Sequence, residues 1–126
     1  MMEVYHSMLT DSQDEALERL QVHALKCIYG PGLSGRKMRD MSGLTTLRER
    51  RIIHCDNFAV KCARSDRFGH WFPKNTGRKT RNTDEYLEEF ARCDRLYYSP
   101  IYYMRRRLNG KPGKTYGLRN AQYRND

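Results

Sequence analysis

Residues 27–51 read CIYGPGLSGRKMRDMSGLTTLRERR, and this stretch predicts where several helices begin and end. Gly30 favours a left-handed backbone conformation, and Pro31 has no amide hydrogen to continue a helical ladder. The pair therefore ends a helix that arrives from the N-terminal side. Helix boundaries at this density are typical of a mainly α-helical chain.

Two further helices are predicted to start inside the same stretch. Ser34 can cap a short helix over residues 35–42, which Gly43 then ends. Thr46 and Glu49 form a capping box, in which each residue can bond the free backbone amide of the other. A third helix should therefore begin at Thr46.

Working outward, the first helix is predicted to begin at Thr10. Gln13 follows three residues later and completes a second capping box. Apolar residues then recur at helical spacing, which predicts a buried face made of Leu17, Leu20, Ala24 and Ile28. On the third helix the same argument predicts a buried stripe, running through Ala63, made of Leu47, Cys55, Phe58, Ala59 and Cys62.

The chain changes character after Ser65. Residues 66–73, DRFGHWFP, are predicted to form an aromatic lid. The polar, basic residues 74–84 are predicted to be either a linker or a segment that is disordered until bound. Tyr86, Leu87 and Phe90 favour one short helical piece over residues 84–92. Ser99 and Pro100 open a terminal helix that Asn109 and Gly110 close.

These elements together predict a small, mainly α-helical assembly of three N-terminal helices plus a short C-terminal helix. The basic linker and the tail after Lys111 are expected to be partly disordered. The expected divisions are residues 1–73 as a helical extension, 74–84 as linker, and 85–126 as a basic aromatic segment.

The charge points to a polyanionic partner. Lys and Arg number 24 against 15 Asp and Glu, which gives a net charge of +9. Residues 1–65 carry 10 bases and 8 acids (+2), whereas residues 66–126 carry 14 and 7 (+7). An excess of this sign favours nonspecific contact with RNA or DNA.

Three segments, in order, carry a family resemblance: ALERLQVHALKCIYGPGLS (16–34), SGLTTLRERR (42–51) and RLYYSPIYYMRRRLN (95–109). They resemble the region that follows the polymerase core in reverse transcriptases of non-LTR (LINE-type) retrotransposons. The resemblance covers most of the chain. It implies that residues 4–21 are the end of the thumb, that a small helical extension follows, and that other reverse-transcriptase segments are possible partners.

The resemblance brings no active site with it. The palm of such polymerases holds two divalent metals with an Asp-Asp pair and a third acid, and no Asp-Asp pair occurs in this sequence. Because the chain begins inside the resemblance, we expect a piece of a larger protein. It should have no catalytic residues, no enzymatic activity and no cofactor of its own.

The candidate nucleic-acid contacts are bases interleaved with tyrosines, which can pair with phosphates while stacking on bases. The predicted set is Lys74, Arg78, Lys79, Arg81, Arg95, Tyr98, Tyr103, Arg105, Arg106, Arg107 and Lys111. An equally physical alternative places Tyr97, Tyr102 and Met104 in a minor core, with the arginines solvated outside. In the alternative function, the helices dock on a protein partner through Leu17, Leu20, Phe58 and Trp71, and the basic half only solubilises the chain.

The sequence gives weaker signals for a metal site or for catalytic carboxylates than for nucleic-acid binding. Cys55 and Cys62 lie seven residues apart, so they share a helical face and are expected to be small core residues. All four cysteines, including Cys27 and Cys93, are expected to be reduced thiols. The alternative is a zinc site made from Cys55, Cys62 and His70 with either His54 or Cys93. No metal is predicted, and the acids Asp84, Glu85, Glu88 and Glu89 are expected at the solvated surface.

The sequence shows neither a signal peptide nor an apolar run near the roughly 20 residues that span a bilayer. The expected location is therefore intracellular, in either the nucleus or the cytoplasm, without a membrane partner.

Overall fold

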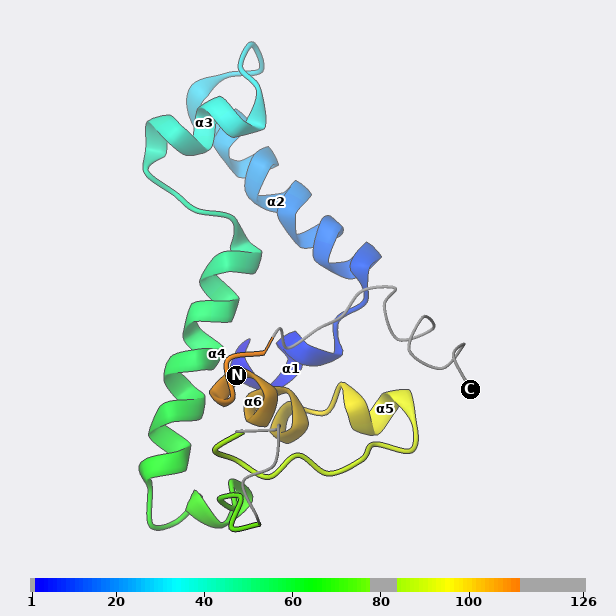
Figure 1. Ribbon diagram of the computed structural model, residues 1–126. Helices are drawn as coiled ribbons and strands as arrows, with labels where there is room; N and C mark the ends of the chain where they lie inside the picture. The colour runs from blue at the N-terminus through cyan, green and yellow to red at the C-terminus, as the bar shows by residue number, and fades with distance from the viewer. Residues whose placement is uncertain (1, 78–83, 112–126) are drawn as a thin grey trace.

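The structure, a computed structural model, describes residues 2–77 and 84–111. Within these residues the regular elements are six α-helices and two 3₁₀ helices (Figure 1), which confirms the mainly α-helical fold. They are α1 (Met2–Tyr5), η1 (His6–Met8), α2 (Asp11–Tyr29), α3 (Gly35–Ser42), α4 (Leu47–Arg64), η2 (Gly69–Trp71), α5 (Asp94–Tyr97) and α6 (Pro100–Leu108).

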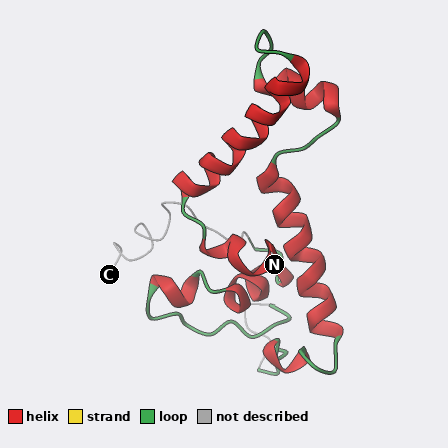
Figure 2. Cartoon of the chain, turned by 180° about the vertical axis from the view of Figure 1, so that it is seen from behind, coloured by secondary structure: helices red, strands yellow, loops and turns green. Residues whose placement is uncertain are grey.

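The molecule has two regions, which we call the arm and the body. The arm is residues 11–43, in which α3 folds back on α2 at the end far from the other helices (Figures 1 and 2). The body contains α1, η1, α4, η2, α5 and α6. Helix α4 runs from the base of the arm down one side of the body, where it packs on α6 and α1.

The predicted helix ends are confirmed. Both capping boxes form, since the side chains of Thr10 and Thr46 accept from the amides of Gln13 and Glu49, and the Gln and Glu side chains accept in return. Gly43 ends α3 with a φ of 67°, a conformation that costs any residue with a Cβ atom. These caps fix the boundaries locally, without help from the rest of the chain.

The core of the body lies between α4 and α6. Its buried residues are Cys55, Ala59, Cys62, Phe72, Tyr103 and Met104. Cys55, Ala59 and Cys62 confirm the buried stripe predicted for α4, and the two cysteines are core thiols as expected. The predicted aromatic lid is real, because Phe72 is buried and Phe68 and Trp71 pack against the cluster.

The predicted buried face of α2 is wrong. Leu20 and Ile28 are 64% and 72% exposed, and the buried residues of α2 are instead Asp14, Gln21 and Leu25. The reason lies in tertiary contacts between α2 and α4. Arginines of α4 bind Asp14 and Gln21, and these polar contacts turn a different face of α2 toward its neighbour.

The short helix predicted over residues 84–92 is also wrong. This segment is extended and forms an antiparallel bridge between Tyr86 and Lys74. The amide of Leu87 donates to the carbonyl of Pro73, and the Asn109 side chain bonds the Tyr86 amide and carbonyl. These long-range bonds take the backbone groups that a helix would have used.

The body draws on both ends of the chain. Residues 2–8, where no helix was predicted, form α1 and η1 and contact α4 and α6. His6 and Ser7 are buried, and the His6 ring meets the Tyr103 ring edge-on at 5.5 Å. The core therefore crosses the predicted division between residues 1–73 and 85–126.

Candidate nucleic-acid interface

Helix α6 carries most of the predicted contacts, and the body surrounds it. Pro100 occupies the first turn, where a missing amide hydrogen costs nothing. α4 lies on one side of α6, and the extended segment 84–91 lies on another. Four consecutive residues of α6, Tyr103 to Arg106, are consequently buried.

Two predicted arginines bind the chain itself. Arg105 is 8% exposed and donates from Nε to the carbonyl of Trp71 at 2.9 Å. Arg106 is 7% exposed, donates from Nη2 to the carbonyl of Tyr97 at 2.8 Å, and stacks 3.9 Å above the Tyr97 ring centre. Burial lowers the pKa of Arg106 below its usual value, and nearby tyrosines and Glu88 only partly offset this.

Arg107 is tied to α4. Its Nε and Nη2 donate to the two carboxylate oxygens of Asp56 at 2.8 and 2.6 Å. This two-pronged pairing is the strong geometry for a guanidinium and a carboxylate. The Asp56 hydrogen bonds raise the pKa of Arg107, and burial opposes them only in part. Arg107 therefore joins α6 to α4.

Lys111 closes a similar contact at the end of α6. Its Nζ donates to Asp84 at 2.5 Å and to Glu88 at 3.1 Å. Burial lowers the pKa of Lys111, but the hydrogen bonds to these two acids outweigh it, so the pKa lies above its usual value. The pairing holds the extended segment 84–88 against the end of the helix.

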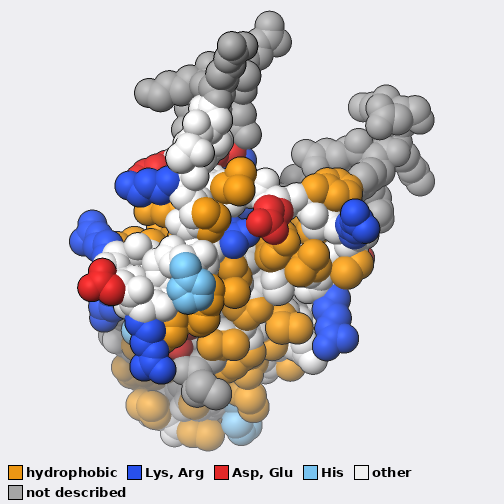
Figure 3. Space-filling model, turned by 90° about the horizontal axis from the view of Figure 1, so that it is seen from below, with side chains coloured by type: hydrophobic (Ala, Val, Ile, Leu, Met, Phe, Trp, Pro, Cys, Tyr) orange, Lys and Arg blue, Asp and Glu red, His pale blue; other side chains and the backbone are white. Residues whose placement is uncertain are grey.

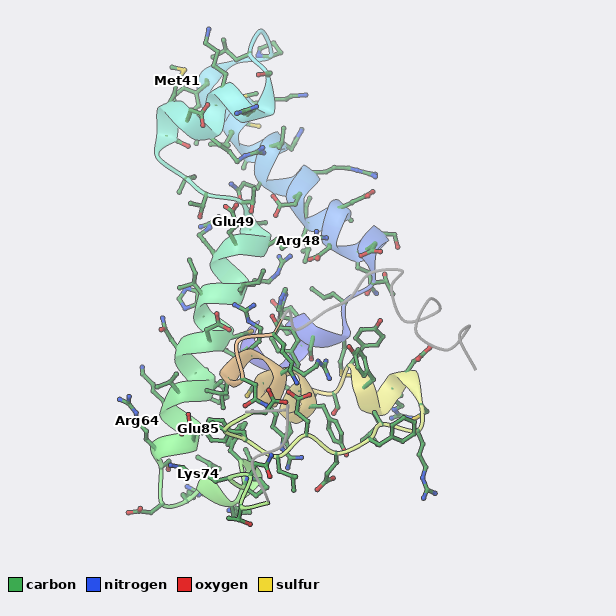
Figure 4. All side chains as sticks on the ribbon, viewed as in Figure 1. Met41, Arg48, Glu49, Arg64, Lys74 and Glu85 are labelled. Carbon is green, nitrogen blue, oxygen red and sulfur yellow. The ribbon has the colours of Figure 1, made fainter. Side chains whose placement is uncertain are left out.

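The remaining predicted residues are spread over the surface. Tyr103 is only 2% exposed, whereas Tyr98 is half-buried against the Tyr97 ring. Arg95 is exposed, and Lys74 is exposed beside Glu85 at 3.6 Å (Figure 4). Arg78, Lys79 and Arg81 lie outside the described residues. Among the described positions, Lys74 and Arg95 are the ones turned to solvent, and Arg105, Arg106 and Arg107 hold the body together.

A cavity of about 240 Å³ lies between α6 and the extended segment. Its lining is aromatic and charged: Glu88, Glu89, Phe90, Ala91, Tyr97, Tyr102, Arg105 and Arg106. The Tyr102 hydroxyl donates to Glu89 at 3.1 Å. Burial, followed by the bond to Glu89, raises the pKa of Tyr102, so this hydroxyl stays protonated at neutral pH.

Sequence reasoning missed a buried polar joint between arm and body. Asp14 is fully buried and pairs with Arg51 and Arg48 of α4. Arg51 also donates from Nε to Nδ1 of His6 at 3.3 Å. No local pattern could have identified this joint, because its members come from three separate segments.

It also missed the basic end of the arm, which we call the tip: Lys26, Arg36, Lys37 and Arg39. Residues 19–39 contain five bases and no acid, a run that the sequence alone could have revealed. Lys26, Arg36 and Lys37 are exposed, and Arg39 is half-buried. The tip is far from α6, as Figure 1 shows, so the basic charge has two centres.

Neither a metal centre nor a membrane span is found in the part of the chain that the structure describes. There, no three His, Cys, Asp or Glu side chains come close enough together to hold a metal ion. Among the same residues, no helix has both the length and the apolar composition needed to cross a bilayer.

No protein-family model matches the chain, and neither a curated protein nor a solved structure matches it.

Proposed function

We propose that this chain is a non-catalytic helical module, related to the region after the polymerase core of non-LTR reverse transcriptases. Its function is to hold RNA or single-stranded DNA without sequence preference through phosphate contacts. The resemblance of its three segments motivates the family, and its surface charge motivates the activity.

The basic tip of the arm is the main support for the proposed binding activity. Lys26, Arg36 and Lys37 are exposed on α2 and α3, and residues 19–39 contain no acid. The fourth base of the tip, Arg39, is half-buried and lines a hollow that also includes acids of α2. Exposed guanidinium and ammonium groups attract phosphates and release their counterions on binding. Arg95 and Lys74 add exposed bases on the body.

The test is a salt titration of binding to a labelled single strand. We expect a dissociation constant of roughly 10⁻⁶–10⁻⁴ M at physiological salt, with affinity falling as salt rises. The double variant Arg36→Gln/Lys37→Gln should weaken binding and reduce the salt slope by about 0.7 for each phosphate that is no longer neutralised.

The matched control is Lys61→Gln/Arg64→Gln, which removes the same charge from the exposed face of α4. It should change affinity less than the tip variant does. Binding that is absent at low salt, or that ignores salt, contradicts the proposal. Primer extension by the pure chain would contradict the non-catalytic part.

A second candidate function is protein docking, favoured by the exposed apolar stripe of α2. Leu20, Ala24 and Ile28 recur every four residues along this helix and face solvent. Stripes of this spacing dock into the grooves of partner proteins. The other predicted docking residues, Leu17, Phe58 and Trp71, are half-buried.

Co-purification with a recombinant polymerase segment of a non-LTR reverse transcriptase separates the two candidates. If docking is the function, wild type and Arg36→Gln/Lys37→Gln co-purify with that segment, and Leu20→Glu/Ile28→Glu does not. If all three fail to co-purify while RNA binding follows salt, the docking candidate is wrong.

A further inference from the structure

We propose that the cavity between α6 and segment 88–91 binds one unstacked guanine base of a single strand. The inference rests on the proposed function and adds a base preference to it. Phosphate contacts elsewhere would hold the strand, and this cavity would read one of its bases.

The size and the walls of the cavity suit one planar ring system. About 240 Å³ is below the roughly 300–1,000 Å³ of pockets that enclose drug-sized ligands. Phe90, Tyr97 and Tyr102 are aromatic residues of the lining, and Arg106 covers one face of the Tyr97 ring. Single-stranded bases are commonly held by stacking on such rings.

Arg105 supplies an unsatisfied donor at this place. Its side chain is 10% exposed, and its Nε is used by the Trp71 carbonyl. Its buried Nη1 has no hydrogen-bond partner among the described residues, although it forms an ion pair with the Glu89 carboxylate at 3.9 Å. A buried donor without an acceptor is costly, so a shift of the Arg105 side chain that brings Nη1 to an acceptor on a ligand in the cavity would be favourable.

Glu89 supplies the complementary acceptor. Its side chain is 56% exposed, and one carboxylate oxygen receives the Tyr102 hydroxyl, which leaves acceptor capacity facing the same ring. With two glutamates and two arginines the lining is balanced in formal charge, so a free phosphate gains little there. The preferred ligand is neutral and carries both donors and acceptors.

Guanine matches this set better than the other bases. Its O6 and N7 are the acceptors to which arginine most often bonds, and its N1 and N2 hydrogens can both reach one carboxylate. Adenine and cytosine each offer one amino group without an adjacent ring N–H, and uracil offers one ring N–H without an amino group. The two donors of guanine are therefore the feature that Glu89 selects.

The experiment compares two RNA strands of about twelve nucleotides, one all uridine and one with a single central guanosine. We expect the guanosine to tighten binding by wild type roughly tenfold. Glu89→Gln should abolish this gain, so that the variant binds the two strands equally. Glu85→Gln removes an exposed acid from the same segment outside the cavity, and it should keep the gain.

The outcomes separate this inference from the proposed function. Equal, salt-dependent binding of both strands by wild type overturns the guanine site alone, as does a Glu89→Gln variant that keeps the preference. If neither strand binds, the proposed function fails, and titration with guanosine and uridine monophosphates decides the site. Shifts of tyrosine ring proton resonances that guanosine monophosphate alone causes, and that Glu89→Gln removes, support it; their absence overturns it.

Discussion

The arm and the body differ in the kind of side chain that they bury. The body buries a cluster of six side chains between α4 and α6 and covers it with further aromatic residues. In the arm, the buried apolar residues are Leu25 and Met38, while Leu20, Ile28 and Met41 are more than half exposed. Figure 4 shows Met41 at the outer edge of α3.

The difference assigns separate roles to the two regions. Apolar burial dominates folding stability, so the body is the part that can hold its shape by its own core. The arm depends on helix caps and on the polar joint at its base. Its exposed apolar stripe and basic tip are the surfaces that the proposed protein or nucleic-acid partner would use.

The other end of the molecule has an apolar surface as well. Seen from below, Figure 3 shows hydrophobic side chains gathered across the face of the body, with basic groups at its edges. In the extended segment, Phe90 is 73% and Leu87 is 40% exposed. Phe90 also lines the cavity proposed for guanine.

The largest expected effect comes from breaking the joint. Asp14→Ala leaves Arg51 buried without its carboxylate, and losing one partner of a buried pair typically costs about 3–5 kcal/mol. Urea unfolding measures the loss. Glu15→Ala, which removes an exposed pair with Arg19, should cost less than about 0.5 kcal/mol. Equal losses for the two variants would mean that the joint does not anchor the arm.

Two methionines, one from each region, sharpen the comparison. Met104 lies in the body core and Met38 in the arm, and both are buried. Met104→Ala should lower the free energy of unfolding of the whole chain by about 2–5 kcal/mol. Met38→Ala should speed amide exchange mainly in α3 and the adjoining end of α2. If Met38→Ala exposes the α4 amides equally, arm and body unfold as one unit.

A smaller, pH-dependent effect is expected from the contact of Lys111 with the extended segment of the body. Because the folded-state pKa of Lys111 is raised, its pairing with Asp84 and Glu88 stabilises the fold at pH values below about 10.5. That contribution is lost as pH rises through the higher folded-state pKa. Lys111→Gln should cost up to about 1 kcal/mol at pH 7 and less in strong base. Parallel pH–stability curves for wild type and variant would contradict this.

The smallest effect is expected on the exposed stripe of the arm. Leu20→Glu/Ile28→Glu places charges where solvent already reaches, so the free energy of unfolding should change by less than about 0.5 kcal/mol. Leu25→Glu, on the buried side of the same helix, should unfold the arm. Circular dichroism and urea titration distinguish the two. A severe loss in the first variant would mean that the stripe is not solvent-exposed.

The helix boundaries could be predicted because their causes are local. Thr10 and Thr46 bond amides three residues away, and Gly43 needs only its own backbone freedom. The buried face of α2 could not be predicted, because Asp14 is buried by arginines 34 and 37 residues further along the chain. Apolar periodicity carries no information about such pairing.

The candidate site divides in the same way. The mixture of tyrosines and arginines in residues 95–107 was readable from the sequence, and it does surround a cavity. Which arginines would turn inward was not readable, because the carbonyls of Trp71 and Tyr97 and the carboxylate of Asp56 lie on other elements. The segment that forms the opposite wall was predicted as a helix, so its contribution to the cavity was missed.

The positions of the cysteines allow the distance between arm and body to be followed. Cys27 on the arm and Cys93 on the body are exposed, while Cys55 and Cys62 are buried, and burial raises the pKa of Cys62. Reactive dyes should therefore label one position in each region of the natural sequence, because the thiolate is the reacting form. Energy transfer between the two dyes would report whether the arm swings when a strand or a protein is bound.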